Sequence, residues 1–284
     1  MRKSLLLSLV ALGAAASSAF AADLPTQKGP PPAPTIVMAP YSWAGFYVGV
    51  NGGYADPTAK LSVSSPNGVW SGDNDWGPSL YGPGIAAVGT ASIGLHGFIG
   101  GAQAGYNYQI NNFVLGVESD ADYMNLNGSY ATPKYYDHND GPGQYWANGS
   151  ARVDSLFTLR LRAGLAFDRL LVFATGGLAV TDEKFSQSIG YYNPSNNIQL
   201  PITGNANGYN AGSASTTTVT GVIGGGVEYA FDKNWSIKGE YLYVPLKSLG
   251  FTSVSTVDST YVMNHHESLS ALNVFRIGLN YRFQ

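Results

Sequence analysis

The sequence predicts an all-β fold, an eight-stranded antiparallel barrel that crosses a membrane. Eight segments alternate apolar and polar residues at a period of two, and the connections between them alternate short and long. In the clearest segment, residues 113–123, the odd positions are apolar or small, whereas Glu118, Asp120 and Asp122 share the opposite face. Such a strand suits a wall between lipid and a polar interior.

The first 21 residues predict a signal peptide. Arg2 and Lys3 precede an apolar run over 5–16, and Ala19-Phe20-Ala21 forms a small-residue cleavage site. An uncleaved anchor is the alternative, but the run is too short for a membrane-spanning helix. We therefore expect export and an integral place in the outer membrane.

Residues 22–42 predict a Pro-rich periplasmic arm, since Pro30-Pro31-Pro32-Ala33-Pro34 favours extended polyproline geometry. A ligand for a peptide-recognition domain is the alternative reading. The barrel domain is then expected over 43–284.

Within that domain the elements follow in order. We expect strands near 43–55, 94–110, 113–124, 152–167, 170–181, 216–231, 235–244 and 272–283. Short turns fall at Asn111-Asn112, Asp168-Arg169 and Asp232-Lys233-Asn234, and four long loops at about 56–93, 125–151, 182–215 and 245–271. This asymmetry predicts short periplasmic turns and four long extracellular loops.

Aromatic residues at the strand ends predict two girdles at the lipid interfaces. The periplasmic girdle would hold Trp43, Phe46, Tyr106, Tyr108, Phe113, Phe167, Tyr229, Phe231, Trp235, Tyr281 and Phe283. The outer girdle would hold Tyr54, Phe98, Tyr123, Phe157, Tyr243 and Phe275. A soluble sandwich or lipocalin-like barrel, the alternative, gives no reason for aromatics massed at strand ends.

The polar faces predict a set of charges inside the barrel. Its members are Glu118, Asp120, Asp122, Arg160, Arg162, Glu228, Lys238, Glu240, Arg276 and Arg282. The short turn after Phe231 sets Glu228 near Lys238. Matching Phe113 to Phe167 sets Glu118 opposite Arg162 and Asp120 opposite Arg160, although barrel shear can shift this pairing by about a residue or two. The segment 170–181 is apolar or small on both faces, so its orientation stays open.

Composition excludes several functions. The net charge is -3, which gives no electrostatic reason to expect nucleic-acid binding. The absence of Cys removes thiol chemistry, and no spacing of Ser, His and carboxylate picks out a nucleophile and its base. Gly224 to Gly226 lie within a strand pattern, which favours close packing over a phosphate loop. We expect neither an enzyme nor a cofactor.

Three motifs resemble a known family. Trp43-Ala44-Gly45-Phe46-Tyr47-Val48-Gly49, Gly224-Gly225-Gly226-Val227-Glu228-Tyr229 and Gly278-Leu279-Asn280-Tyr281-Arg282-Phe283 are similar to the small outer-membrane porin-family proteins of alphaproteobacteria. The resemblance implies an eight-stranded barrel related to the OmpA transmembrane domain, and the family includes surface antigens and haemin-binding members. Members end in a Phe that resembles a barrel-assembly signal; here Gln284 is last, so recognition by the assembly machinery would rest on Phe283.

We expect a protein that supports envelope integrity and displays its surface loops. Its partners would be outer-membrane lipid, lipopolysaccharide, the barrel-assembly machinery and host or cell-surface ligands. The alternatives are a small-solute channel and a haem-binding surface receptor. For haem, the candidate ligands are His265, His266, Tyr261 and His138, beside Asp137 and Asp140.

Overall fold

The computed structural model describes residues 41–64, 82–132, 135–136, 144–192, 210–254 and 262–283. The chain divides into two compact units, Met1–Ala39 and Pro40–Gln284, and the described residues belong to the second. The expected signal peptide and all but the last two residues of the expected arm lie outside the described residues. Among the helices described, none combines the length and apolarity that a membrane crossing requires.

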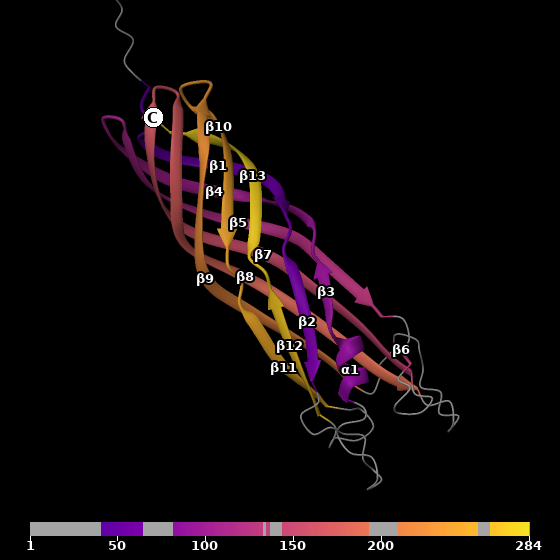
Figure 1. The fold of residues 1–284 in the computed structure, drawn as a ribbon. Helices are drawn as coiled ribbons and strands as arrows, with labels where there is room; N and C mark the ends of the chain where they lie inside the picture. The colour runs from indigo at the N-terminus through magenta and orange to yellow at the C-terminus, as the bar shows by residue number, and fades with distance from the viewer. Residues whose placement is uncertain are drawn as a thin grey trace, which may run out of the picture. The chain divides into compact units, whose positions relative to one another are not determined.

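Eight antiparallel strands form a closed barrel, as the sequence predicts (Figure 1). They are β1 (Gly45–Ala55), β4 (Gly97–Ile110), β5 (Phe113–Ala131), β7 (Gln144–Phe167), β8 (Leu170–Tyr192), β9 (Asn210–Ala230), β10 (Trp235–Val244) and β13 (Leu272–Arg282). Their order is β5-β4-β1-β13-β10-β9-β8-β7, and pairing of β5 with β7 closes the ring. The two-residue strand β6 (Tyr135–Tyr136) pairs with β7.

A second, four-stranded sheet continues part of the wall on the side opposite the short turns (Figure 1). It contains β2 (Thr58–Ser64), β3 (Ala91–Gly94), β11 (Ser248–Val254) and β12 (Val262–Leu269) in the order β11-β12-β2-β3. Each follows or precedes a barrel strand across a break of two or three residues, and Pro57 and Pro245 lie in two of these breaks. Since proline cannot donate to a ladder, it ends regular pairing there. The short helix α1 (Gly82–Gly89) precedes β3.

The other four strands run unbroken far beyond the membrane requirement. β5, β7, β8 and β9 contain 19, 24, 23 and 21 residues, whereas about 9–11 cross the hydrocarbon. Much of the chain expected as long loops is therefore strand. We call the part of the wall beyond the outer aromatic girdle, made by β2, β3, β11, β12 and the ends of these four long strands, the outer tier.

The short turns fall where the sequence predicts. Asn111 and Asp168 adopt positive φ angles of 54° and 52°, a left-handed conformation that Asn and Asp tolerate because their side chains bond locally. These turns hold β4 to β5 and β7 to β8 in tight hairpins.

The outward faces carry the apolar residues. Phe98, Leu161 and Phe275 are 79%, 72% and 62% exposed. Side chains that face lipid are exposed in this way when the protein is considered without its surrounding lipid. Every aromatic residue expected in the outer girdle is exposed. One assignment to the periplasmic girdle is wrong: Trp43 is 1% exposed and points inward, because its indole Nε1 donates to the Asp168 carbonyl at 3.0 Å.

Candidate functional site: the filled lumen

The middle of the lumen holds a network of buried, directly paired charges. We call it the charge network; its members are Glu118, Asp120 and Asp122 of β5, Arg160 and Arg162 of β7, Glu228 of β9, Lys238 and Glu240 of β10, and Arg276 of β13. Their side chains are between 0% and 4% exposed. Alternation places them inside because each strand turns every second residue to the lumen.

Arg160 is the centre of the network. Its guanidinium lies 2.6 Å from Asp120, 2.6 Å from Glu240 and 2.5 Å from Glu118. Because Glu240 stands on β10, on the far side of the ring from β7, this contact spans the lumen. A second ion pair across the lumen joins Arg276 to Asp120 at 2.7 Å. Paired and hydrogen-bonded in this way, the charges meet the condition for stable burial.

Two inward-facing glycines make room for the network. A β-carbon on Gly105 would collide with the Tyr47 ring, whose hydroxyl donates to Glu118 at 2.6 Å. A β-carbon on Gly278 would stand 2.9 Å from the Gln103 amide and 3.4 Å from the Lys238 side chain. The small residues thus allow large polar side chains to fill the lumen.

The observed register between β5 and β7 differs from the expected one by two residues. Phe113 pairs with Leu165 instead of Phe167, so Glu118 stands opposite Arg160 and Asp120 opposite Thr158. The connection between these strands is long, so no tight turn fixes their register from sequence alone. On the short hairpin between β9 and β10, Glu228 does stand opposite Lys238.

Arg282 lies apart from the charge network, at the mouth of the lumen beside the short turns. It donates to the Lys233 carbonyl at 3.0 Å and to the Tyr41 hydroxyl, and its guanidinium lies over the Tyr41 and Trp43 rings. A buried apolar cluster closes the lumen beside it, formed by Trp43, Val114, Ala166, Leu171, Phe173 and Ala230. Leu171 and Phe173 settle the orientation of 170–181, since both side chains point inward.

An apolar layer fills the lumen on the other side of the charge network. On β5 the inward series runs from Val114 through the three acids to Met124 and Leu126, both 0% exposed. On β7 the inward residues beyond Arg160 are Thr158, Leu156 and Val153, with Leu156 and Val153 in the same cluster as Met124. The lumen is therefore filled in three successive layers: an apolar cap, the charge network and a second apolar layer.

Comparison with known proteins identifies the family of this barrel. The family model described as "Outer membrane protein beta-barrel domain" matches residues 5–283. The chain belongs to this outer-membrane barrel family. It is similar to the 31 kDa outer-membrane immunogenic protein of Brucella melitensis, with 32% identity over 286 residues and 100% of both chains covered.

A second outer-membrane protein and one solved structure are less similar. The 25 kDa outer-membrane immunogenic protein of Brucella abortus is 27% identical over 246 residues, covering 84% of this chain and 89% of its own. The solved structure of OprG from Pseudomonas aeruginosa has 12% identity and a TM-score of 0.45, with 85% of this chain and 97% of that chain covered. As a member of the outer-membrane barrel family, this protein is integral to the outer membrane.

Two of the candidate haem ligands, His265 and His266, lie in the part of the chain that the structure describes, on opposite faces of β12. His265 is 2% exposed, and both ring nitrogens are occupied: Ser253 Oγ lies 2.6 Å from Nε2 and Gln187 Oε1 lies 2.6 Å from Nδ1. His266 is exposed on the opposite face of β12. Tyr261 and His138, with Asp137 and Asp140, lie outside the described residues. Over the described ranges, no group of three or more His, Asp or Glu side chains could hold a metal.

Sequence reasoning missed the environment of His265. The Gln187 oxygen accepts from Nδ1, so Nε2 accepts from Ser253, an order of bonds that also occurs in serine hydrolases. Here Ser253 and Gln187 are 3% and 1% exposed, and the Phe251 ring stacks on the imidazole at 4.6 Å. A substrate has no access to this serine. In the outer tier, burial lowers the pKa of His265 to about 4 and raises the pKa of Glu267 to about 8.

Proposed function

We propose that this outer-membrane barrel is a non-enzymatic protein that stabilises the envelope and displays its outer tier to the surroundings. The observation that carries the proposal is the continuation of the wall beyond the apolar band. Along β7 and β8 the outward side chains change from Phe157 and Val180 to Ser150 and Ser186 within a few residues. An ordered wall with a polar outer face fits display outside the membrane.

The filled lumen supports this proposal over a solute channel. An eight-stranded barrel has an interior about wide enough for side chains alone. A water path would have to part the ion pairs of Arg160 and Arg276 and also cross the apolar layer around Leu156. Separating a buried pair leaves a poorly compensated charge, and the apolar layer offers water no partners.

The relatives support surface exposure, because their names describe them as immunogenic. Lipid and lipopolysaccharide are the surroundings of such a barrel, and host or cell-surface ligands would meet the outer tier. Phe283 is the proposed recognition point for the assembly machinery; its amide donates to the Phe46 carbonyl at 2.9 Å and its ring is 49% exposed. We also propose residues 1–21 as a signal peptide and 22–42 as a periplasmic arm.

Cysteine labelling tests the display, since the chain has no Cys of its own. Ser186 is exposed in the outer tier and Asn112 is exposed on a short turn. On intact cells, a membrane-impermeant maleimide is expected to label Ser186→Cys, and Asn112→Cys only after the outer membrane is permeabilised. Labelling of Asn112→Cys alone on intact cells would show the reverse orientation.

A further inference from the structure

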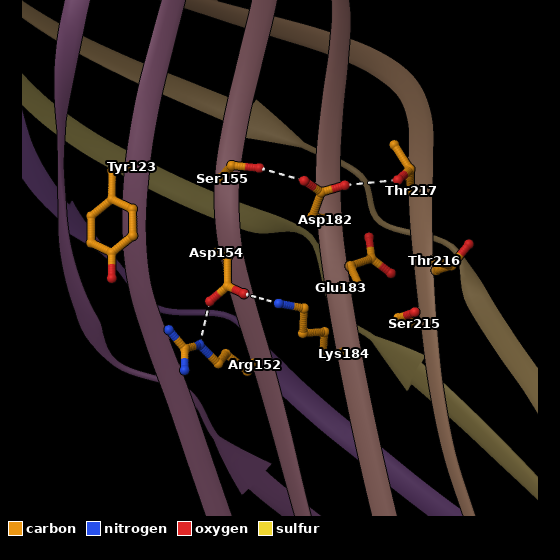
Figure 2. A pocket seen from close by; sticks show the side chains of 10 residues that line it. All are labelled: Tyr123, Arg152, Asp154, Ser155, Asp182, Glu183, Lys184, Ser215, Thr216 and Thr217. Atoms are coloured by element: carbon orange, nitrogen blue, oxygen red, sulfur yellow. Dashed lines mark hydrogen bonds and ion pairs between the residues drawn. The ribbon is translucent and has the colours of Figure 1, made fainter.

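A polar groove lies on the outward face of the barrel, directly beyond the lipid-facing band. Figure 2 shows the side chains that line it. Its volume is about 460 Å³, and β5, β7, β8 and β9 line it. Cross-strand pairing fixes the position of the groove along the barrel axis. Ala121, Phe157, Val180 and Val219 form one apolar row across the four strands, and Tyr123, Ser155, Asp182 and Thr217 form the next outward row. The surface thus changes from apolar to polar within two residues of each strand, or about 7 Å.

A bulge in β7 builds the charged end of the groove. Val153 pairs with Glu183 and Ser155 with Asp182, so Asp154 is an extra residue. Val153 points inward, and Asp154 and Ser155 both turn outward. Bulges re-aim side chains and are frequent beside functional sites.

The bulged carboxylate holds two cations together. Asp154 accepts from Lys184 Nζ at 2.7 Å and from Arg152 Nε, and Figure 2 shows the three side chains converging. The Arg152 and Lys184 side chains are 50% and 59% exposed, whereas Asp154 is only 18% exposed. The positive groups therefore face the surroundings, and the carboxylate between them is largely covered.

Of the charged side chains that line the groove, only the cations Arg152 and Lys184 are exposed; its three carboxylates are partly or fully buried. Asp182 accepts from Ser155 at 2.9 Å and from Thr217 at 2.7 Å, so each carboxylate oxygen already accepts one hydrogen bond. Glu183, which also lines the groove, is 1% exposed and accepts from Thr181 at 3.0 Å. Arg152 has five N–H donors and Lys184 three, and Asp154 takes only one from each in these contacts. Phosphoryl oxygens match such a pair of exposed cations in charge and geometry.

We propose that this groove binds the phosphorylated headgroup of an outer-leaflet glycolipid. Arg152 and Lys184 bind the phosphate, and the Tyr123 ring, 62% exposed at the edge of the apolar band, packs against the headgroup sugar. The acyl chains then lie along the apolar row around Phe157. A soluble phosphate would use the same donors, but the groove faces sideways along the membrane, as lipid-facing Phe157 does. The inference rests on the outward orientation proposed above, which cysteine labelling tests separately.

Titration of the folded full-length chain in detergent with diphosphorylated lipid A tests the proposal. Arg152→Gln with Lys184→Gln is expected to weaken binding about 10- to 30-fold, since each basic residue near a lipid phosphate contributes about a factor of five. The charge-conserving pair Arg152→Lys and Lys184→Arg is expected to bind within about threefold of the unmodified chain, which separates loss of charge from loss of fold. Lys60→Gln, which removes an exposed lysine of β2, serves as the matched control and should change binding less than about twofold.

Three results would overturn the proposal. One is unchanged affinity of the folded double glutamine variant. Another is equal weakening by Lys60→Gln, which would indicate attraction by overall charge. The third is displacement of lipid A by millimolar inorganic phosphate, which would indicate a site for a free anion. A variant that keeps its unheated gel mobility is folded, so a failed fold is recognised independently.

Discussion

Replacing Arg160 with methionine removes the centre of the charge network while keeping most of the side-chain volume. Its guanidinium contacts Glu118, Asp120 and Glu240, and all four side chains are at most 1% exposed. Each acid keeps another cation: Glu118 keeps Lys238, and Asp120 and Glu240 keep Arg276. The cost is therefore that of one uncompensated buried charge and not of three. Breaking a buried pair costs about 3–5 kcal/mol.

A double-mutant cycle separates the lost charge from the lost packing. Glu240→Gln together with Arg160→Met restores the charge balance, so we expect the pair to recover about 1–3 kcal/mol relative to the sum of the single variants. The assay is urea unfolding of the barrel refolded in lipid vesicles, followed by gel mobility without heating. Arg152→Met is the control; Arg152 is half exposed and paired at the surface, so its loss should cost far less stability than the loss of Arg160.

Two outcomes would refute this reasoning. Arg160→Met could cost no more than Arg152→Met, in which case the network contributes little to stability. Alternatively, the cycle could show additivity, in which case Arg160 and Glu240 do not interact in the folded barrel.

Further predictions concern the lipid face, the apolar layer and the outer tier. Leu161→Arg, at a lipid-facing position 72% exposed, should cost about 2–4 kcal/mol in vesicles, whereas Ser186→Arg beyond the apolar band should cost under about 0.5 kcal/mol. Leu156→Ala, buried in the apolar layer, should cost about 2–5 kcal/mol in the same urea assay. The pKa of Glu267 is raised to about 8 and that of His265 is lowered to about 4, whereas the unfolded values are near 4.3 and 6.5. Between about pH 4.5 and 6.5, Glu267 makes the free energy of unfolding fall with pH and His265 makes it rise, so the two effects cancel. Outer-tier stability should then fall as pH rises from about 6.5 through 8, because folded Glu267 keeps its proton in this range whereas the unfolded chain has released it. Hydrogen exchange of β12 measures this fall, and Glu267→Gln should abolish it; persistence of the fall in that variant would contradict the assignment.

Alternation at a period of two was sufficient to predict the barrel and the inward position of most of its charges. The inward position of Glu118, Asp120 and Asp122 followed from strand alternation alone, because every second residue of β5 points to the lumen. Hairpin geometry also placed Glu228 opposite Lys238, since a short turn fixes register.

The remaining features depend on contacts that the sequence pattern does not contain. The outer tier was expected as loops because its outward residues, such as Ser150 and Ser186, are polar as in a loop, although the inward series through Met124 and Leu126 continues the strand. The β5–β7 register depends on barrel closure and not on a turn. Trp43 is an aromatic residue at the start of a strand, as a girdle residue would be. Only its hydrogen bond to the Asp168 carbonyl shows that it points inward and closes the lumen.

Ion conductance tests most directly whether the lumen is closed. The purified full-length chain would be reconstituted in a planar bilayer, with a large trimeric porin in the same bilayer as a positive control. Because the charge network and the apolar layers fill the lumen in series, we expect no sustained conductance beyond rare small events. Stable, reproducible open channels from the folded chain would contradict a closed lumen and move this protein to the transport class.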